Sequence, residues 1–236
     1  MIHALSRRIV SEFLGTGFLV AAVVGSGIMG ERLAGGNVAI ALLANTIATG
    51  AALAALILTF GPISGAHLNP AVTLMDAIEH GVSWTVAACY VPTQCAGGIC
   101  GAIAAHLMFG LPAIAWSHHA RSGSTQVFSE FIATFGLLCV IWGCSRQHTG
   151  VVPFAVAAYI TAAYWFTSST SFANPAVTIA RSLSDTFAGI RPVDVAPFVA
   201  AQLAGAVAAT LLFRWLVPSL DINAKRILLD LKPENS

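Results

Sequence analysis

The chain has 236 residues, of which 57% are hydrophobic and only 9% are charged, and its mean hydropathy is +0.81. Soluble domains carry about 25% charged residues, so this composition excludes a mainly water-facing surface and favours a protein solvated by lipid. The formal net charge of +1, without a basic tract, argues against a nucleic-acid partner.

Six apolar segments are long enough, or nearly so, to cross a hydrocarbon core of about 30 Å. We predict transmembrane helices over residues 9–29, 38–60, 84–109, 127–145, 151–168 and 194–217. Two shorter apolar segments that contain proline, 66–78 and 172–183, each follow a long span directly. Because they are too short to cross, we expect them to be re-entrant half-helices.

The chain also repeats itself, with three matches in the same order in both halves. The matched segments are 11–16 with 129–134, 69–73 with 174–178, and 94–97 with 202–205. Three spans per half give the second copy the opposite topology, because an odd number of crossings ends on the other side. The sequence therefore predicts an all-α membrane protein with six tilted transmembrane helices and two re-entrant half-helices, arranged as an inverted repeat of two three-span halves.

We expect a single channel domain over residues 1–236. Its parts are a first repeat over 7–109, a linking loop over 110–125, a second repeat over 126–217 and a cytoplasmic C-terminal tail over 218–236.

Basic residues predict the orientation, since cytoplasmic loops carry an excess of lysine and arginine. If both termini are cytoplasmic, that side holds Arg7, Arg8, Arg146, Arg214, Lys225, Arg226 and Lys232. The other side then holds Arg32, Arg121, Arg181 and Arg191. We therefore expect a multi-pass protein of the cell (inner) membrane with both termini in the cytoplasm.

Each half contains an Asn-Pro-Ala triplet, and these are Asn69-Pro70-Ala71 and Asn174-Pro175-Ala176. Asn is a preferred N-cap, and Pro suits the first helical position, where an N–H would have no partner. We predict that a half-helix begins at each triplet and that the two N-termini meet near the membrane centre. Each N-terminus carries roughly half a positive charge, so the pair disfavours cations and protons, while the amides offer donors to a passing oxygen.

The residues before each triplet are expected to supply acceptors. Non-helical backbone at this depth is tolerated only where it lines a watery cavity or is buried in protein. We therefore predict a ladder of pore-facing carbonyl groups opposite apolar side chains, from Gly65, Ala66, His67, Phe172 and Ala173. The ring of His67 is expected to pack against protein.

Glu12 and Glu130 are carboxylates inside predicted spans, at equivalent positions of the two halves. Intramembrane acids are costly and usually face the protein interior. They could relay protons or accept N–H bonds from the irregular re-entrant loops. Their equivalent placement favours the structural role.

Together these motifs resemble the major intrinsic proteins, the family of aquaporins and aquaglyceroporins. The resemblance runs from Glu12 to about Leu216 and includes the segment 64–71, both Glu-x-x-x-Thr segments and both Gln-x-x-Gly segments. It implies a right-handed bundle, a homotetramer with one pore per subunit, and passive conduction of water or small uncharged solutes.

The resemblance further implies a selectivity filter on the outer side, at Thr49, Ala162, Ser171 and Val177. Family members almost always carry Arg at the last position, where it narrows the pore and adds a fixed cation. Here that residue is Val177, and the nearest arginine, Arg181, follows one turn later. We expect a wide, less polar filter that admits glycerol and metalloid acids such as arsenous acid, as in bacterial aquaglyceroporins associated with arsenic resistance.

Three other functions remain open on the sequence. These are a water-selective aquaporin, a proton-coupled transporter that uses Glu12 and Glu130, and a junction or sensor protein that conducts little. No motif indicates an enzyme, a metal site or a cofactor. The expected partners are water, small uncharged solutes, membrane lipid and three further copies of the chain.

Overall fold

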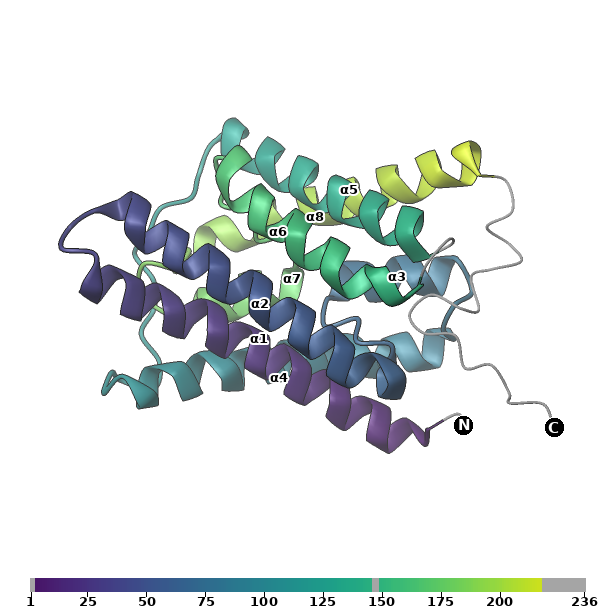
Figure 1. Ribbon diagram of the computed structural model, residues 1–236, viewed down its shortest axis with the longest axis horizontal. Helices are drawn as coiled ribbons and strands as arrows, with labels where there is room; N and C mark the ends of the chain where they lie inside the picture. Colours follow the sequence, from purple (N-terminus) through teal and green to yellow (C-terminus); the bar gives the residue numbers. More distant parts are fainter. Residues whose placement is uncertain (1–2, 146–148, 218–236) are drawn as a thin grey trace.

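The computed structural model describes residues 3–145 and 149–217. Its elements in chain order are α1 (Leu5–Leu33), α2 (Val38–Ser64), α3 (Pro70–Ile78), α4 (Trp84–Met108), α5 (Ser124–Ser145), the 3-10 turn η1 (Thr149–Val151), α6 (Val152–Phe166), α7 (Pro175–Arg181) and α8 (Pro192–Leu216) (Figure 1). The predicted tail over 218–236 lies outside the described residues, as do Arg146, Lys225, Arg226 and Lys232.

Within the described residues, five helices, α1, α2, α4, α5 and α8, are long and apolar enough to cross a membrane. The span predicted over 151–168 is shorter than expected, because α6 has only 15 residues. At 1.5 Å per residue it is about 22 Å long. The preceding turn η1 adds about 6 Å, so together they approach the thickness of the hydrocarbon core.

The helix directions confirm the predicted inverted repeat. In the first half α1 and α4 run one way and α2 runs the other way, whereas in the second half α5 and α8 run along α2 (Figure 1). The start of α1 and the end of α8 consequently lie at the same end of the bundle (Figure 1).

The half-helices α3 and α7 begin in the middle of the bundle and extend toward opposite ends (Figure 1). Each begins at the Pro of its triplet, with the Asn before it extended, at φ −155° for Asn69 and φ −157° for Asn174. The residues just before the triplets do not continue a helix. Ala66, Leu68 and Ala173 instead have positive φ values of 45°, 49° and 48°, which few non-glycine residues adopt.

Within each half, small residues bring two long helices into backbone contact. A methyl group on Gly97 or Gly101 of α4 would strike the backbone of α1, and one on Gly205 of α8 would strike α5 at Phe131. Such close approach is typical of helix pairs in membranes, where packing rather than hydrophobic exclusion drives association.

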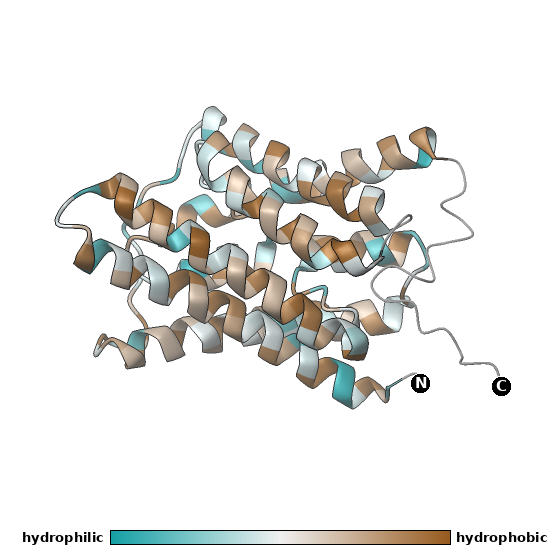
Figure 2. Cartoon of the chain, viewed as in Figure 1, coloured by the Kyte–Doolittle hydropathy of each residue, from teal (hydrophilic) through white to brown (hydrophobic). Residues whose placement is uncertain are grey.

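The outer surface is apolar. Large apolar side chains are exposed on the long helices, among them Phe18, Ile47, Leu107, Phe128 and Leu211, and apolar residues predominate along the bundle (Figure 2). Polar side chains are buried instead around the half-helices. Apolar side chains on the outside and polar side chains in the interior are the distribution expected of a protein surrounded by lipid.

Candidate pore

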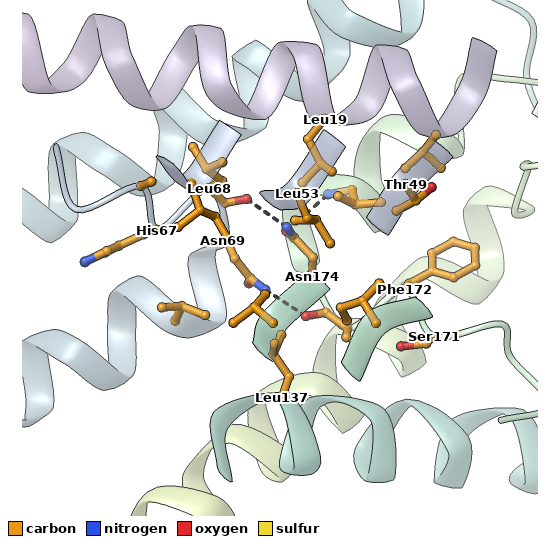
Figure 3. A pocket seen from close by; sticks show the side chains of 18 of the residues that line it. Leu19, Thr49, Leu53, His67, Leu68, Asn69, Leu137, Ser171, Phe172 and Asn174 are labelled. Atoms are coloured by element: carbon orange, nitrogen blue, oxygen red, sulfur yellow. Dashed lines mark hydrogen bonds between the residues drawn. The ribbon is translucent and has the colours of Figure 1, made fainter. Parts of the chain in front are cut away.

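A cavity lies between the two halves where α3 and α7 meet, with about 720 Å³ of empty space, part of it open to solvent. Thr49, Ser171 and Phe172 lie on one side of the two Asn side chains and His67 lies on the other (Figure 3). The side that holds Thr49, Ser171 and Phe172 is the outer end of the cavity if the termini are cytoplasmic. This follows because α7 runs away from the end of the bundle where α1 begins (Figure 1).

The two Asn side chains tie the half-helices together. Asn69 Nδ2 donates to the carbonyl of Ala173 at 2.8 Å, and Asn174 Nδ2 donates to the carbonyl of Leu68 at 2.8 Å (Figure 3). Each amide thus bonds the residue before the opposite Asn. One N–H of each amide is used in this way, which leaves one, rather than two, for a solute.

The oxygen atoms of the same two amide groups are also hydrogen-bonded. Asn69 Oδ1 accepts the N–H of Ala71 at 2.9 Å, and Asn174 Oδ1 accepts those of Ala176 and Val177 at 3.0 and 3.3 Å. These are N-cap bonds, made at the positions where a helix has unpaired donors. Both the nitrogen and the oxygen of each amide group are therefore hydrogen-bonded, and the fold sets the orientation of these side chains in the cavity.

Glu12 holds the first re-entrant loop from behind. It is fully buried and accepts the N–H groups of His67 at 3.0 Å and Leu68 at 2.8 Å, together with the Ser64 hydroxyl at 2.6 Å. Gln94 Nε2 donates to the same carboxylate at 2.8 Å and to Thr73 Oγ1 at 2.9 Å.

Glu130 does the same for the second loop. It accepts the N–H groups of Phe172 and Ala173, both at 2.9 Å, and Gln202 Nε2 bridges it to Thr178 Oγ1. Gln94 and Gln202 were noted in the sequence only as a repeat match. Their recurrence after each triplet, in the matched Gln-x-x-Gly segments, was the available signal for this role.

With their N–H groups bound to carboxylates, the loops have carbonyl oxygens free on the other side. Within the described residues, no hydrogen bond reaches the carbonyls of Ala66, His67 or Phe172, all of which border the cavity. Gly65 does not border the cavity. Its φ of 95° ends α2, and its N–H bonds the carbonyl of Gly61.

The facing wall is apolar. It is formed by side chains of α1, α2, α5 and α6, namely Leu19, Val23, Leu53, Ile57, Leu137, Ile141, Val152, Val156 and Ile160. The cavity therefore offers hydrogen-bonding groups along one side and hydrocarbon along the other.

The assignment of Ala162 to the filter is wrong. Ala162 is exposed on the outer face of α6 and does not border the cavity, whereas Ile160 and Tyr164 do. The Tyr164 hydroxyl lies 3.1 Å from Thr49 Oγ1 and forms a hydrogen bond with it. The rotation of α6 about its axis thus turns the aromatic ring of Tyr164 toward the cavity, whereas the sequence predicted the methyl group of Ala162 there.

An arginine also lies at this end of the cavity. Val177 does border the cavity, but so does Arg181, one turn further along α7, and it is 2% exposed. Arg121, from the linking loop, is buried beside it and donates to the carbonyls of Gly189 and Ser169 at 2.7 and 3.0 Å. Burial lowers the pKa of Arg121 to about 10, which leaves it protonated at neutral pH.

At the inner end, the ring of His67 is packed as expected. Its Nδ1 lies 3.1 Å from Thr73 Oγ1, its Nε2 lies 3.4 Å from Asp76 Oδ2, and its ring meets Tyr90 edge-on at 5.6 Å. Asp76 was not singled out in the sequence, because a lone acid in a short helix carries no distinctive pattern.

The inverted repeat and the paired half-helices around a central cavity define a membrane channel built from two homologous halves. The sequence profile described as "Major intrinsic protein" matches residues 2–164 and, separately, residues 144–234. The chain belongs to the major intrinsic protein family, as its motifs predicted.

Individual relatives agree. The chain is 55% identical over 213 residues to aquaglyceroporin AqpS of Rhizobium meliloti (strain 1021), which covers 90% of this chain and 91% of that protein. It is 33% identical over 149 residues to aquaporin NIP3-1 of Oryza sativa subsp. japonica, and this match covers 58% of this chain and 44% of that protein. The X-ray structure of the aquaglyceroporin from Plasmodium falciparum shares the fold, with a TM-score of 0.71 and 21% identity over 93% of this chain and 100% of that one.

Proposed function

We propose that the protein is a passive channel for glycerol and water that excludes protons and ions. The observation that carries this proposal is the meeting of two helix N-termini in one cavity, where Asn69 and Asn174 each bond the opposite half. Two positive helix ends oppose the entry of a cation, and the fixed amides favour a neutral solute that can accept a hydrogen bond.

The two-sided wall suits a polyol. The free carbonyls of Ala66, His67 and Phe172 can accept from hydroxyl groups, while the opposite hydrocarbon wall contacts the carbon chain. A metalloid acid such as arsenous acid presents a similar set of hydroxyl groups, and we include it among the proposed solutes. In this scheme Glu12 and Glu130 are structural, since their oxygens are occupied by loop donors.

We further propose that the protein is a homotetramer in the cell (inner) membrane with both termini in the cytoplasm. The shared end of α1 and α8 supports the terminal placement (Figure 1). The exposed apolar side chains of the long helices would contact lipid and the other copies. Two of the four basic residues assigned to the outer side, Arg121 and Arg181, are buried, which leaves Arg32 and Arg191 as the basic residues of that side that contact solvent.

Stopped-flow light scattering on proteoliposomes tests the function. Gradients of glycerol, urea and arsenous acid should each relax faster than in protein-free vesicles, and water should also permeate. These rates should not change when a proton or sodium gradient is imposed. Acceleration of water alone would identify the water-selective alternative, and uphill movement on a proton gradient would identify the transporter.

Replacing Asn174 with Asp should make the channel leak cations. Asp keeps the cap bonds to Ala176 and Val177, so α7 should still begin at Pro175. It replaces the donor to the Leu68 carbonyl with an oxygen and adds a negative charge where two helix ends oppose cations. We expect sodium flux into vesicles to rise at least about tenfold, equivalent to about 1.4 kcal/mol of barrier. Asn174→Ser, a neutral cap, is the control and should stay sodium-tight.

A further inference from the structure

One guanidinium group at the outer end has donors that the protein does not use. Arg181 is the last residue of α7, and its Nε donates to the carbonyl of Ala188. Within the described part of the chain, neither Nη1 nor Nη2 of Arg181 makes a hydrogen bond or an ion pair. Because the residue borders the cavity, these donors are available only to what the cavity contains.

The guanidinium is held in place by stacking. The Cζ atom of Arg181 lies 3.3 Å from the centroid of the Phe172 ring, and that of Arg121 lies 4.9 Å from the same centroid. A planar cation over an aromatic face is a favourable arrangement that also fixes its orientation. Phe172 is in turn 4% exposed and packs edge-on against Phe198 at 5.4 Å.

The charge of this group is not cancelled by a partner. No carboxylate among the described residues forms a salt bridge with Arg181 or Arg121. Glu130 acts on both electrostatically, but its oxygens accept from Phe172, Ala173 and Gln202. An unpaired buried cation is costly unless polar groups or water solvate it, so Arg181 draws its solvation from the cavity.

The repeat supports this placement independently. The shift of 105 residues that maps Asn69 onto Asn174 also maps His67 onto Phe172 and Asp76 onto Arg181. In the first half Asp76 contacts the ring of His67, and in the second half Arg181 contacts the ring of Phe172. Both half-helices thus bring a charged side chain against the ring that precedes the triplet, with an acid at the inner end and a base at the outer end.

A second unpaired group lies near the same end of the cavity. Ser171 borders the cavity, and its buried hydroxyl has no hydrogen-bond partner in the described chain. By contrast, the hydroxyls of Thr49 and Tyr164 are bonded to each other. Among the described side chains that border the outer end of the cavity, the Nη groups of Arg181 and the Ser171 hydroxyl therefore have no hydrogen-bond partner.

We propose that Arg181 is the outer selectivity residue of this channel. Its Nη groups bind the hydroxyl oxygens of neutral solutes with at least two hydroxyls, with Ser171 as a second contact, and its charge repels cations. Val177 leaves the space beside it open, so that the cation is set back by one helical turn and the passage stays wide enough for a polyol. This assignment rests on the proposed channel function.

The test uses the full-length protein in proteoliposomes with three variants. Arg181→Gln removes the charge, and Arg181→Lys keeps it but loses the planar pair of Nη donors. Arg121→Gln is the matched control, because Arg121 stacks on the same ring and braces the same loop without bordering the cavity. The readouts are methylammonium influx at neutral pH, the ratio of glycerol to water permeability, and the thermal midpoint.

We expect Arg181→Gln to raise methylammonium influx at least tenfold, while Arg121→Gln and Arg181→Lys stay at the wild-type level. Arg181→Lys should lower the glycerol-to-water ratio at least threefold. If Arg181→Gln does not fold, the ratio in Arg181→Lys decides alone. An unchanged ratio, or equal leaks in the Arg181 and Arg121 glutamine variants, would mean that Arg181 only braces the loop. If wild-type vesicles pass neither water nor glycerol, the channel function itself fails, and this assignment with it.

Discussion

Replacing Val177 with arginine is expected to abolish most glycerol and arsenous acid permeation while water still passes. Val177 is 4% exposed and borders the cavity one turn before Arg181, so the new side chain would occupy the same wall. It would narrow the passage and place two guanidinium groups together. We expect glycerol permeability to fall at least about tenfold, which corresponds to a barrier higher by about 1.4 kcal/mol. Stopped-flow measurements on proteoliposomes check this.

Two control variants separate size from charge. Val177→Leu adds bulk without charge and should lower glycerol permeability less than arginine does, whereas Val177→Thr conserves the volume and should change it little. Water permeability should stay near the wild-type value in all three variants, and the thermal midpoint should stay near the wild-type value in the two uncharged variants. Unchanged glycerol and arsenous acid flux in Val177→Arg would remove Val177 from the filter.

Replacing Glu12 with glutamine is expected to destabilise the protein and reduce both water and glycerol flux. Each carboxylate oxygen of Glu12 accepts two donors, so the amide NH₂ of glutamine must face two of them. A buried donor left without an acceptor costs about 1–3 kcal/mol. The N–H of either His67 or Leu68 would lose its acceptor, which would loosen the loop from its fixed geometry. A lower thermal midpoint in detergent, measured together with flux in vesicles, checks the prediction.

The matched control is Glu79→Gln. Glu79 is another buried carboxylate, but it pairs with Arg214 of α8 at 2.6 Å, away from the cavity lining. Its variant should lower the thermal midpoint while keeping both water and glycerol flux near the wild-type values. If Glu12→Gln instead retained its stability and lost a proton-driven uphill transport, the structural role of this carboxylate would be refuted.

Much of the site could be predicted because the repeat and the triplets are local signals. Asn suits the N-cap and Pro suits the first helical position, and α3 and α7 begin at Pro70 and Pro175. The matched positions of Glu12 and Glu130 indicated their equivalent contacts. The crossed bonds of Asn69 and Asn174 could not be predicted, because each joins residues more than a hundred positions apart.

The apolar composition and the two matched halves by themselves determined that this chain folds as an inverted repeat of helices in lipid, since charge-poor spans and an odd number of crossings allow no other plan. Only the tertiary structure decided which side chains line the cavity. The α6 helix is apolar all round, so its sequence does not specify its rotation, and packing against α2 and α5 turned Tyr164 inward and Ala162 outward. The orientation of the Arg181 side chain toward the cavity likewise depends on tertiary contacts, namely the ring of Phe172 and the carbonyl of Ala188.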